Sequence, residues 1–452
     1  MNFGKEKIMA EKIRVLIHEN KIIELSEYLQ GMKPVDIAKR MMDLEAEDLI
    51  LVFRILSKDT SAEVFSYLDK ESQQYIVEII ADSEVKEIIE KLFLDDTVDL
   101  IEELPANIVK KVLKNTSRQK RELINQFLKY NESSAGSIMT IEFVDLKEDM
   151  TVKEAINHTR KTGLNKETID TCFVIDNYRK LKGTITIKDL ILSNEDILIS
   201  NIMDKNTISV KTCEDQEKVA SLFKEYDLVS MAVVDKEERL VGIITIDDIV
   251  DIIEQENTED FQKMAAIKPS EEAYLKTPVL QLAKHRVVWL LVLMISATVT
   301  GSIIKEFDEV IQSVVILAAF IPMLMDTGGN AGSQSSTLII RGLALGDIST
   351  KDYLKVMYKE FRVSLIVASI LSAVNFLRIY FLENTDIMIT LTVCGSLFFT
   401  VIIAKVVGSI LPIIAKKLKL DPAIMASPLI TTIVDAFALT IYFTLARLFL
   451  GI

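Results

Sequence analysis

The run VVWLLVLMISATVTGSII, residues 287–304, carries no charged side chain and is long enough to cross a lipid bilayer as a helix. Further apolar runs of similar length follow it, so the C-terminal part of the chain is predicted to be a membrane domain. The later spans are expected at residues 311–340, 363–381, 387–415 and 423–450. Five spans place the two ends of the chain on opposite sides of the membrane.

The charges of the connecting loops predict the orientation. Lys284 and Arg286 precede the first span, and basic residues also fill residues 341–362 and 416–419. The two remaining loops, 305–310 and 382–386, hold Lys305 as their one basic residue. Because Lys and Arg concentrate in cytoplasmic loops, we expect a cytoplasmic N-terminus and an external C-terminus in a multi-pass protein of the plasma membrane.

The region before the spans is strongly acidic. Residues 1–286 hold 55 Asp and Glu against 40 Lys and Arg, whereas residues 287–452 hold 11 against 12. This balance argues against nucleic-acid binding, which needs basic contacts to phosphates, and favours cations or basic partners. An acidic surface that only keeps the domain soluble is the alternative.

The cysteines and histidines predict neither a zinc site nor a catalytic pair. Cys172, Cys213 and Cys394 are far apart in the sequence, as are the histidines. No CxxC motif, P-loop or nucleophile–base motif is present, so an enzyme is not expected.

A polar and glycine-rich stretch interrupts the second span: Asp326-Thr-Gly-Gly-Asn-Ala-Gly-Ser-Gln-Ser-Ser336. Glycines let helices approach closely or let a helix open. We favour the second interpretation, in which Gly328 and Gly329 expose carbonyls and Asn330 faces water or an ion. Tight packing through small residues is the alternative.

Asp435 is a lone carboxylate within the fifth span. It lies 12 residues after Ala423, which is about 18 Å along a helix. Ionisable groups at such depth are usually functional, and no basic residue is near on the same span. A cation site is therefore predicted, with hydroxyl oxygens from Thr431. Pairing with Lys405 or Arg378, or protonation, are the alternatives.

One carboxylate supplies too few ligands for Mg²⁺ on its own, because the ion keeps its water and prefers octahedral oxygen coordination. Two Asp435 side chains facing each other across a dimer axis would double the charge and leave room for a hydrated ion. A homodimer is the hypothesis that follows.

Residues 134–254 contain an internal repeat. Ser137-Ile-Met-Thr140 matches Asn201-Ile-Met-Asp204, and the segment 182–190 matches 241–249. The repeat resembles a tandem pair of CBS domains, which often bind adenosine nucleotides. The Thr-x-x-Asp spacing that such domains use near ribose and phosphate occurs in both copies, although these side chains could simply cap the following helices. The four residues are Thr186, Asp189, Thr245 and Asp248.

Residues 1–130 are predicted to form short amphipathic helices in a superhelical stack, because apolar residues recur there every three to four positions. Asp95 and Asp99 would share one helix face, either as a capped, solvated turn or as half of a cation site. Beyond the repeat, residues 247–260 form a second acidic face on a segment expected to continue largely as a helix towards the first span.

Three segments resemble the MgtE family of magnesium channels. They are PMLMDTGGNAGSQSSTLIIRGLALGDI (322–348), DPAIMASPLITTIVDAFALTIYF (421–443) and TEDFQKMAAI (258–267). The resemblance covers the whole chain and implies four parts: an all-α helical N domain (1–130), an α+β tandem CBS pair (134–254), a connecting plug helix (255–286) and a five-helix membrane domain (287–452).

The family resemblance also implies a homodimeric, Mg²⁺-selective channel in the lipid bilayer that cytoplasmic Mg²⁺ closes. Asp435 would match the pore aspartate, with Thr431, Asn330, Gly328 and Gly329 nearby, and ATP would be a ligand of the CBS pair. A coupled transporter of Co²⁺ or Mn²⁺ and a non-transporting membrane sensor are the alternatives. The implied regulatory metal ligands are Asp95, Asp99, Glu217, Asp227, Asp248, Asp251, Glu256, Glu259, Asp260 and Asp421.

Overall fold

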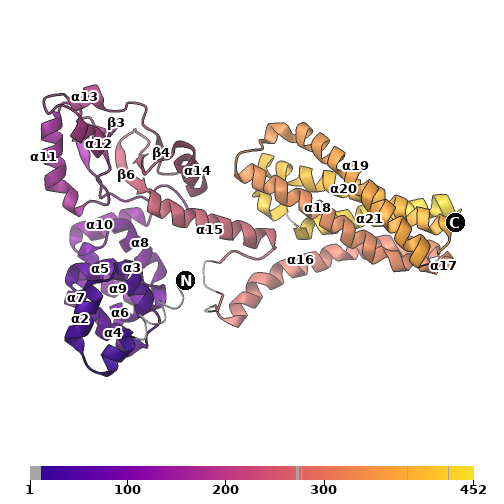
Figure 1. Ribbon diagram of the computed structural model, residues 1–452, viewed down its shortest axis with the longest axis horizontal. Coiled ribbons are helices and arrows are strands. Elements are labelled where there is room, and N and C mark those ends of the chain that lie inside the picture. The colour runs from indigo at the N-terminus through magenta and orange to yellow at the C-terminus, as the bar shows by residue number, and fades with distance from the viewer. Residues whose placement is uncertain (1–11, 271–273, 276, 384, 426, 452) are drawn as a thin grey trace. The chain divides into compact units, whose positions relative to one another are not determined.

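The computed structural model describes residues 12–270, 274–275, 277–383, 385–425 and 427–451 (Figure 1). Met1–Ile253 forms one compact unit and Glu254–Ile452 forms a second. The predicted fold class is confirmed, because short helices, two small sheets and long apolar helices follow one another along the chain.

Short helices fill the N-terminal part of the first unit, and each is eight to ten residues long. Several begin at a side-chain cap; for example, Ser57, Asp69 and Ser117 each accept a hydrogen bond from a backbone N–H of the first turn. The helices are α2 (Ile22–Gln30), α3 (Pro34–Met41), α4 (Ala46–Ile55), α5 (Lys58–Ser66), α6 (Lys70–Ile79), α7 (Asp82–Lys91), α8 (Leu94–Glu103), α9 (Ala106–Asn115) and α10 (Arg118–Phe127).

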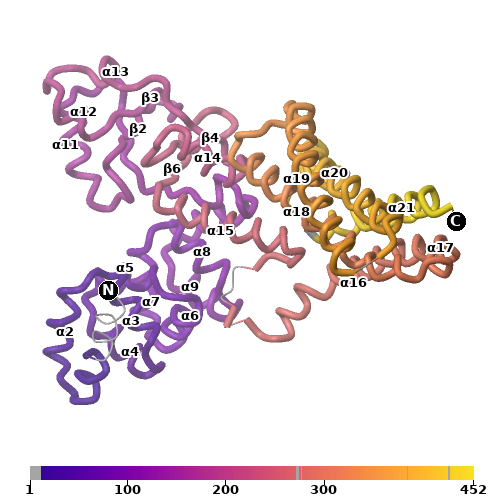
Figure 2. The backbone as a smooth tube through the Cα atoms, turned by 45° about the vertical axis from the view of Figure 1, so that its right-hand side comes forward, coloured from indigo at the N-terminus to yellow at the C-terminus, as the bar shows by residue number. Residues whose placement is uncertain are grey.

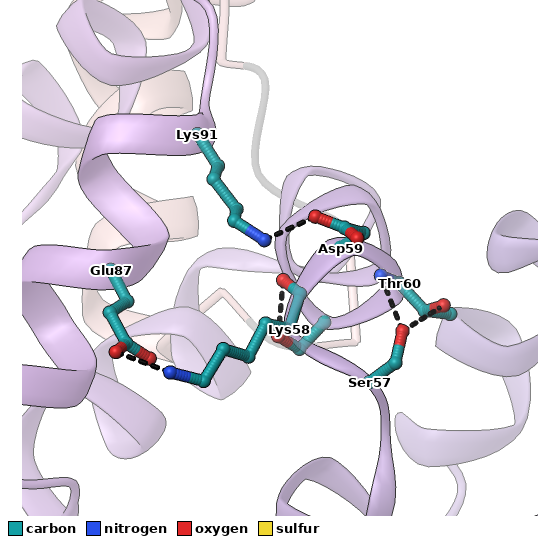
Figure 3. A network of polar contacts seen from close by, with 7 residues as sticks. Ser57, Lys58, Asp59, Thr60, Glu87 and Lys91 are labelled. Carbon is teal, nitrogen blue, oxygen red and sulfur yellow. Dashed lines mark hydrogen bonds and ion pairs between the residues drawn. The ribbon is translucent and has the colours of Figure 1, made fainter.

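Ion pairs join alternate helices on the outside of this stack. Figure 3 shows Lys58 of α5 reaching Glu87 of α7 at 2.5 Å, and Lys91 of α7 reaching back to Asp59 of α5. Exposed pairs of this kind contribute at most about 1 kcal/mol each. The stack is therefore held mainly by the apolar stripes on the inner faces of the helices.

One hydrophobic core runs from these helices into the second CBS repeat. It contains Phe65 and Val98 of the helical stack together with Phe223, Ile244 and Ile252 of the repeat, all buried. The first turn of α8 is thereby fixed close to the start of the last helix of the repeat. This packing positions the acidic residues described below.

Each CBS repeat folds around a three-stranded sheet whose middle strand pairs parallel to one neighbour and antiparallel to the other. The orders are β1-β2-β3 and β4-β5-β6. The strands are β1 (Asp145–Lys147), β2 (Thr171–Ile175), β3 (Leu181–Thr186), β4 (Ser209–Lys211), β5 (Ser230–Val234) and β6 (Leu240–Thr245). The helices are α11 (Val152–Thr162), η1 (Gly163–Asn165), α12 (Ile187–Leu192), α13 (Ile199–Ile202), α14 (Gln216–Tyr226) and α15 (Ile246–Met264).

The matching segments of the repeat are exchanged between the two copies. Thr140, which precedes the first sheet, pairs with Ile243 of the second sheet, whereas Asp204 pairs with Thr184 of the first. A glycine makes room in each case. A Cβ on Gly242 would lie 2.8 Å from the Thr140 carbonyl oxygen, and one on Gly183 would lie 2.5 Å from that of Asp204.

The second unit contains five helices that are long and apolar enough to cross a membrane, among the residues that the structure describes. Four of them, α18 to α21, lie side by side in both views (Figures 1 and 2), and α16 packs against α21. The elements are α16 (Val279–Glu306), α17 (Asp308–Ser313), η2 (Val315–Phe320), α18 (Ile321–Ala344), η3 (Thr350–Asp352), α19 (Tyr353–Leu382), α20 (Ile387–Lys417), η4 (Pro422–Met425) and α21 (Ser427–Leu450).

Two details differ from the expectations. The connecting segment is not one continuous helix: α15 ends at Met264 and α16 begins at Val279, with no helix in the described residues between them. In addition, the glycine-rich stretch does not open, because α18 is continuous from Ile321 to Ala344. Its glycines serve close packing instead, which was the alternative interpretation.

The glycines of α18 fit against the two neighbouring helices. A Cβ on Gly328 would lie 2.7 Å from Thr400 of α20, and one on Gly332 would lie 3.1 Å from the Ala404 carbonyl oxygen. Gly408 of α20 lies against the backbone of Gly332, where no side chain fits. The two helix backbones therefore touch at the Gly332–Gly408 crossing.

We expect Gly408→Ala to disrupt the membrane domain, because the new methyl group would overlap the Gly332 backbone, which cannot move without shifting a whole helix. Gly395→Ala is the matched control on α20, since a Cβ there meets its nearest neighbours only at 4.0 Å. Thermal unfolding in detergent should show a lower midpoint for Gly408→Ala. The midpoint of Gly395→Ala should not fall, because alanine improves helix propensity there. Equal midpoints would contradict this account of the crossing.

Candidate functional site

A polar face lies on the otherwise apolar helices α18 and α21. Asp326 and Asn330 are exposed on α18, and the Asn330 amide donates a hydrogen bond of 3.2 Å to the Asp326 carboxylate. Asp435 is half-buried on α21, and Asp326 is its charged neighbour. The structure thus brings two predicted pore residues, Asn330 and Asp435, onto one pair of helices, together with a second carboxylate.

Asp435 has neither of the basic partners that were considered for it. The Lys405 ammonium lies 3.4 Å from the Ser335 hydroxyl, and Arg378 pairs with Glu383 at 3.6 Å. Within the described part of the chain, Asp435 makes no ion pair or hydrogen bond through its carboxylate. A carboxylate at this depth that lacks a basic partner needs water or a cation beside it.

Thr431 lies one turn before Asp435, where α21 touches α18. A Cβ on Gly329 would lie 2.7 Å from the Thr431 methyl group, so only glycine allows this contact. The hydroxyls of Thr431 and Thr432 both donate to the Pro428 carbonyl oxygen, at 2.9 and 3.1 Å. Gly328 and Gly329 are buried against the neighbouring helices, so they support this face and do not line it.

A second acidic group lies at the junction of α8 with the CBS pair. Asp95, Asp96 and Asp99 of α8 interact electrostatically with Asp248 at the start of α15. Glu167 of the first repeat also acts on Asp95. The predicted pair on α8 thus meets Asp248, a residue about 150 positions later in the chain. We call these five residues the acidic junction.

The crowding raises the pKa of every carboxyl in the acidic junction. Burial is the main cause, and the neighbouring carboxylates add to it. The pKa of Asp96 and that of Asp248 rise to about 6, that of Asp99 to about 7 and that of Glu167 to about 8, while the pKa of Asp95 lies well above its usual value. Further acidic residues act on members of the group: Glu142, Asp247, Asp251, Glu102 and Glu103.

Lys120 is the basic residue that faces the acidic junction. It donates to the carbonyl oxygens of Ile89 and Leu92, at 2.5 Å each, and burial lowers its pKa. One ammonium cannot balance five carboxyl groups. Among the described residues, no three His, Cys, Asp or Glu side chains are arranged to hold one ion directly. The junction therefore offers charge for a hydrated ion but no ready coordination shell.

We expect the thermal stability of the full-length protein in EDTA to fall as pH rises from about 5 to about 8. The junction carboxyls titrate near pH 4 in an unfolded chain but at higher pH in the fold, so the folded state binds more protons and loses that stabilisation as they leave. Added Mg²⁺ should raise the unfolding midpoint more at pH 8 than at pH 5, because it binds deprotonated carboxylates. An unfolding midpoint independent of pH in EDTA would refute the raised pKa values of the junction carboxyls.

Four further predicted regulatory residues lie on α14 and α15 or at the end of α14. Glu217 lies in the first turn of α14, and Asp227 ends that helix in a left-handed conformation at φ 50°. Asp251 is exposed on α15 and acts on Asp248, whereas Glu256 lies further along the same helix. None of these four belongs to the acidic junction.

A third charged group lies within the second unit, where α15 meets the start of α21. Lys263 of α15 pairs with Glu259 and reaches Asp421 at 2.6 Å. The two carboxylates raise the pKa of Lys263 above its usual value, although its partial burial acts the other way. Burial and the nearby Asp421 raise the pKa of Asp260. Three predicted ligands, Glu259, Asp260 and Asp421, therefore surround one ammonium group.

The four residues considered for nucleotide binding act as helix caps. The Thr186 hydroxyl donates to Asp189 at 2.6 Å and accepts from its backbone N–H at 3.1 Å. The Thr245 hydroxyl donates to Asp248 at 2.7 Å. This geometry matches the capping alternative at the starts of α12 and α15.

Sequence reasoning missed Asp326, Asp96, Glu167 and Lys263. Asp326 begins the polar stretch and lies four residues before Asn330. That spacing places both residues on one helix face, so the sequence contained a signal for including Asp326 in the site. Lys263 follows Glu259 at the same spacing. Glu167 carries no local signal, since it stands in a loop and reaches the junction only through the fold.

Three models of known protein families match separate parts of the chain. A model of the MgtE divalent cation transporters matches residues 321–445, one of the MgtE intracellular N domain matches residues 32–133, and the CBS domain model matches residues 135–194 and 199–255. The magnesium transporter MgtE of Thermus thermophilus is 35% identical over 98% of this chain and 99% of its own length. The chain belongs to the MgtE family.

Other MgtE proteins support the assignment. The magnesium transporter MgtE of Bacillus subtilis is 30% identical over 97% of both chains. Two solved structures resemble the N-terminal part: the soluble part of a magnesium transporter (27% identity, TM-score 0.53) and the cytosolic domain of the Mg²⁺ channel MgtE in complex with ATP (32% identity, TM-score 0.52). They cover 56% and 54% of this chain and 99% of their own. MgtE proteins are membrane transporters of magnesium and not enzymes.

Proposed function

We propose that this protein is a Mg²⁺-selective channel whose pore is centred on Asp435 and which cytoplasmic Mg²⁺ closes. The observation that carries the proposal is the exposed polar face of α18 and α21, where Asp435 lacks a basic partner inside an apolar helix bundle. Lipid cannot solvate Asp326, Asn330 and Asp435, so this face must meet water, an ion or a second copy of the chain.

A homodimer would supply water, a bound ion and a second copy of the chain at this face together. Two copies that meet along this face would enclose a hydrated path with two Asp435 carboxylates. Hard oxygen ligands suit Mg²⁺, which retains most of its water when bound to carboxylates. A coupled transporter of Co²⁺ or Mn²⁺ is the alternative, and the absence of His and Cys ligands among the described residues of this face favours Mg²⁺.

The acidic junction and the group around Lys263 support closure by Mg²⁺. In low Mg²⁺ the five carboxyls of the acidic junction repel one another. Bound Mg²⁺ removes this repulsion and favours the compact arrangement, so the closed state gains by its higher affinity for the ion. We place the N-terminus in the cytoplasm, as the loop charges predict, so that these groups sense the internal ion.

An adenosine nucleotide is the second ligand that we propose, at the CBS pair. The support is the MgtE cytosolic domain solved with ATP, to which this chain is 32% identical. Thr186 and Thr245 would contact the nucleotide with hydroxyls that now cap helices. Equilibrium dialysis of the full-length protein with labelled ATP tests this, and no retention at millimolar nucleotide would reject it.

The channel itself is tested by Mg²⁺ flux into proteoliposomes of the full-length protein, reported by a Mg²⁺-sensitive dye inside. We expect flux when Mg²⁺ is low on the side that carries the N-terminus and loss of flux when it is high there. Flux that ignores Mg²⁺ on that side would reject gating, and an absence of flux under both conditions would reject the channel.

We also expect Lys263→Met to make closure more sensitive to Mg²⁺. The Lys263 ammonium neutralises Glu259 and Asp421, which Mg²⁺ would have to share or take over. Removing a partly exposed charge pair worth about 1 kcal/mol should lower the half-closing Mg²⁺ concentration roughly fivefold. Lys268→Met, which removes an exposed lysine nearby, is the control. An unchanged half-closing concentration would show that Asp421 is no Mg²⁺ ligand.

A further inference from the structure

Lys405 is a buried lysine in the middle of a membrane helix. Its side chain is 5% exposed, and it lies 12 residues before the end of α20 at Lys417, about 18 Å along the helix. Removing an ammonium group from water costs several kcal/mol unless other charges and hydrogen bonds offset the loss. Neither the polar face nor the Mg²⁺-sensing groups explain why a cation transporter carries a positive charge here.

The contacts of Lys405 form a chain across three helices. Its ammonium lies 3.4 Å from the Ser335 hydroxyl of α18, and this hydroxyl donates a bond of 2.6 Å to the Glu360 carboxylate of α19. A hydroxyl can accept from an ammonium and donate to a carboxylate at the same time. Lys405 and Glu360 make no direct ion pair among the described residues, so Ser335 connects their charges.

This chain of contacts lies next to the Gly332–Gly408 crossing. Ser335 follows Gly332 by three residues on α18, and Lys405 precedes Gly408 by three residues on α20. The crossing sets how close the two helices lie. The glycine contact at the crossing has no polar direction, whereas the contact through Ser335, one turn away, is directional and constrains rotation about the helix axis.

The rotation of α18 decides which way the polar face points. Successive residues of a helix are about 100° apart, so Ser335 lies on the opposite side of α18 from Asp326 and roughly 140° from Asn330. Ser335 is buried, whereas Asp326 and Asn330 are exposed. Holding Ser335 against Lys405 therefore turns Asp326 and Asn330 towards the face that carries Asp435.

We propose that Lys405 and Glu360 are positioning residues for ion transport, and that their charges, joined through Ser335, fix the rotation of α18. The inference rests on the proposed function only in taking the α18–α21 face as the pore wall. Neither charge touches the transported ion. Their role is to hold Asp326 and Asn330 in register with Asp435.

Mg²⁺ flux of full-length variants in proteoliposomes tests the charge pair. Lys405→Met and Glu360→Gln each leave one charge uncompensated, and each should lower the maximum flux about tenfold, which corresponds to about 1.4 kcal/mol. The Mg²⁺ concentration for half-maximal flux should stay unchanged. The double variant carries neither charge and should recover to within about twofold of wild type. Ser335→Ala should lower flux, and Ser335→Thr, which keeps the hydroxyl, should not.

A labelling experiment measures the rotation without relying on transport. Asn330→Cys, in a protein whose exposed Cys213 is replaced by serine, reports the exposure of this position through its rate of reaction with a charged thiol reagent. Lys405→Met should change that rate several-fold, and adding Glu360→Gln should restore it. This readout remains informative even if the wild-type protein carries no Mg²⁺, in which case the proposed function fails and the positioning role is still decided.

Three outcomes would overturn the inference. Wild-type flux and labelling in Lys405→Met would show that the ammonium is dispensable. Single-variant losses that simply multiply in the double variant would show that the two charges do not act on each other. A shift of the half-maximal Mg²⁺ concentration without a change in labelling would show that Lys405 acts on the ion directly. The proposed function stands in all three cases if wild type conducts Mg²⁺.

Discussion

Asp435→Asn is expected to reduce Mg²⁺ flux by about a hundredfold or more while the protein still folds and inserts. The amide keeps the size and one oxygen of the side chain but removes the charge that attracts a divalent ion. The loss of a charged interaction away from bulk water is worth about 3 kcal/mol, which is about a hundredfold. The flux assay described above measures it, and size-exclusion chromatography in detergent checks the fold.

Asp347→Asn is the matched control for this variant. It makes the same chemical change at an exposed residue beyond the end of α18, and its flux should equal that of wild type. If Asp435→Asn carried Mg²⁺ at the wild-type rate, the carboxylate would be structural. Its lack of a basic partner would then need another explanation, and the pore would have to be sought elsewhere in the bundle.

Neutralising the acidic junction should remove most of the closure by Mg²⁺. In Asp95→Asn/Asp248→Asn, two of the five carboxyl groups no longer repel the others or bind the ion, so the half-closing Mg²⁺ concentration should rise about tenfold or more. Asparagine at position 248 keeps an oxygen that accepts the Thr245 hydroxyl, so the start of α15 is preserved. The same variant should be more stable than wild type in EDTA.

Asp149→Asn/Asp196→Asn serves as the control, because both residues are exposed and lie outside the junction. It should close at the wild-type Mg²⁺ concentration. If the junction variant also closed there, Mg²⁺ sensing would have to rest on the group around Lys263 alone. A rise in EDTA stability without a change in closure would mean that the junction affects folding but not gating.

The spans were predictable because composition alone decides them. Their ends were not: α19 begins at Tyr353, ten residues before the expected start, because the amphipathic segment 353–362 forms a helix although its charges exclude it from an apolar run. The role of the glycines was also undetermined by sequence. A helix that opens and a helix that packs closely both need glycine, and the contacts that decide, with Thr400 and Gly408, come from residues about 70 positions away.

The candidate sites show the same limit. Asp95 and Asp99 could be placed on one face of a helix by their spacing, and Asp435 could be singled out by its depth. No local pattern reveals that Asp248 and Glu167 meet α8, since that contact depends on the shared core of the helical stack and the second repeat. Likewise, the spacing of Lys263 with Glu259 is visible in the sequence, but its contact with Asp421 is not.

The exchange of segments between the two CBS repeats bears on how such a chain could have arisen. In a protein with one repeat, no segment from a second repeat would pack beside the glycine, and the Ile-Met segment would have no strand edge to pair with. Two separate copies could satisfy each other by trading these segments. Gene duplication would then have linked the two halves of an interface that already existed. Each glycine would since have been constrained by the segment of the other repeat that packs against it.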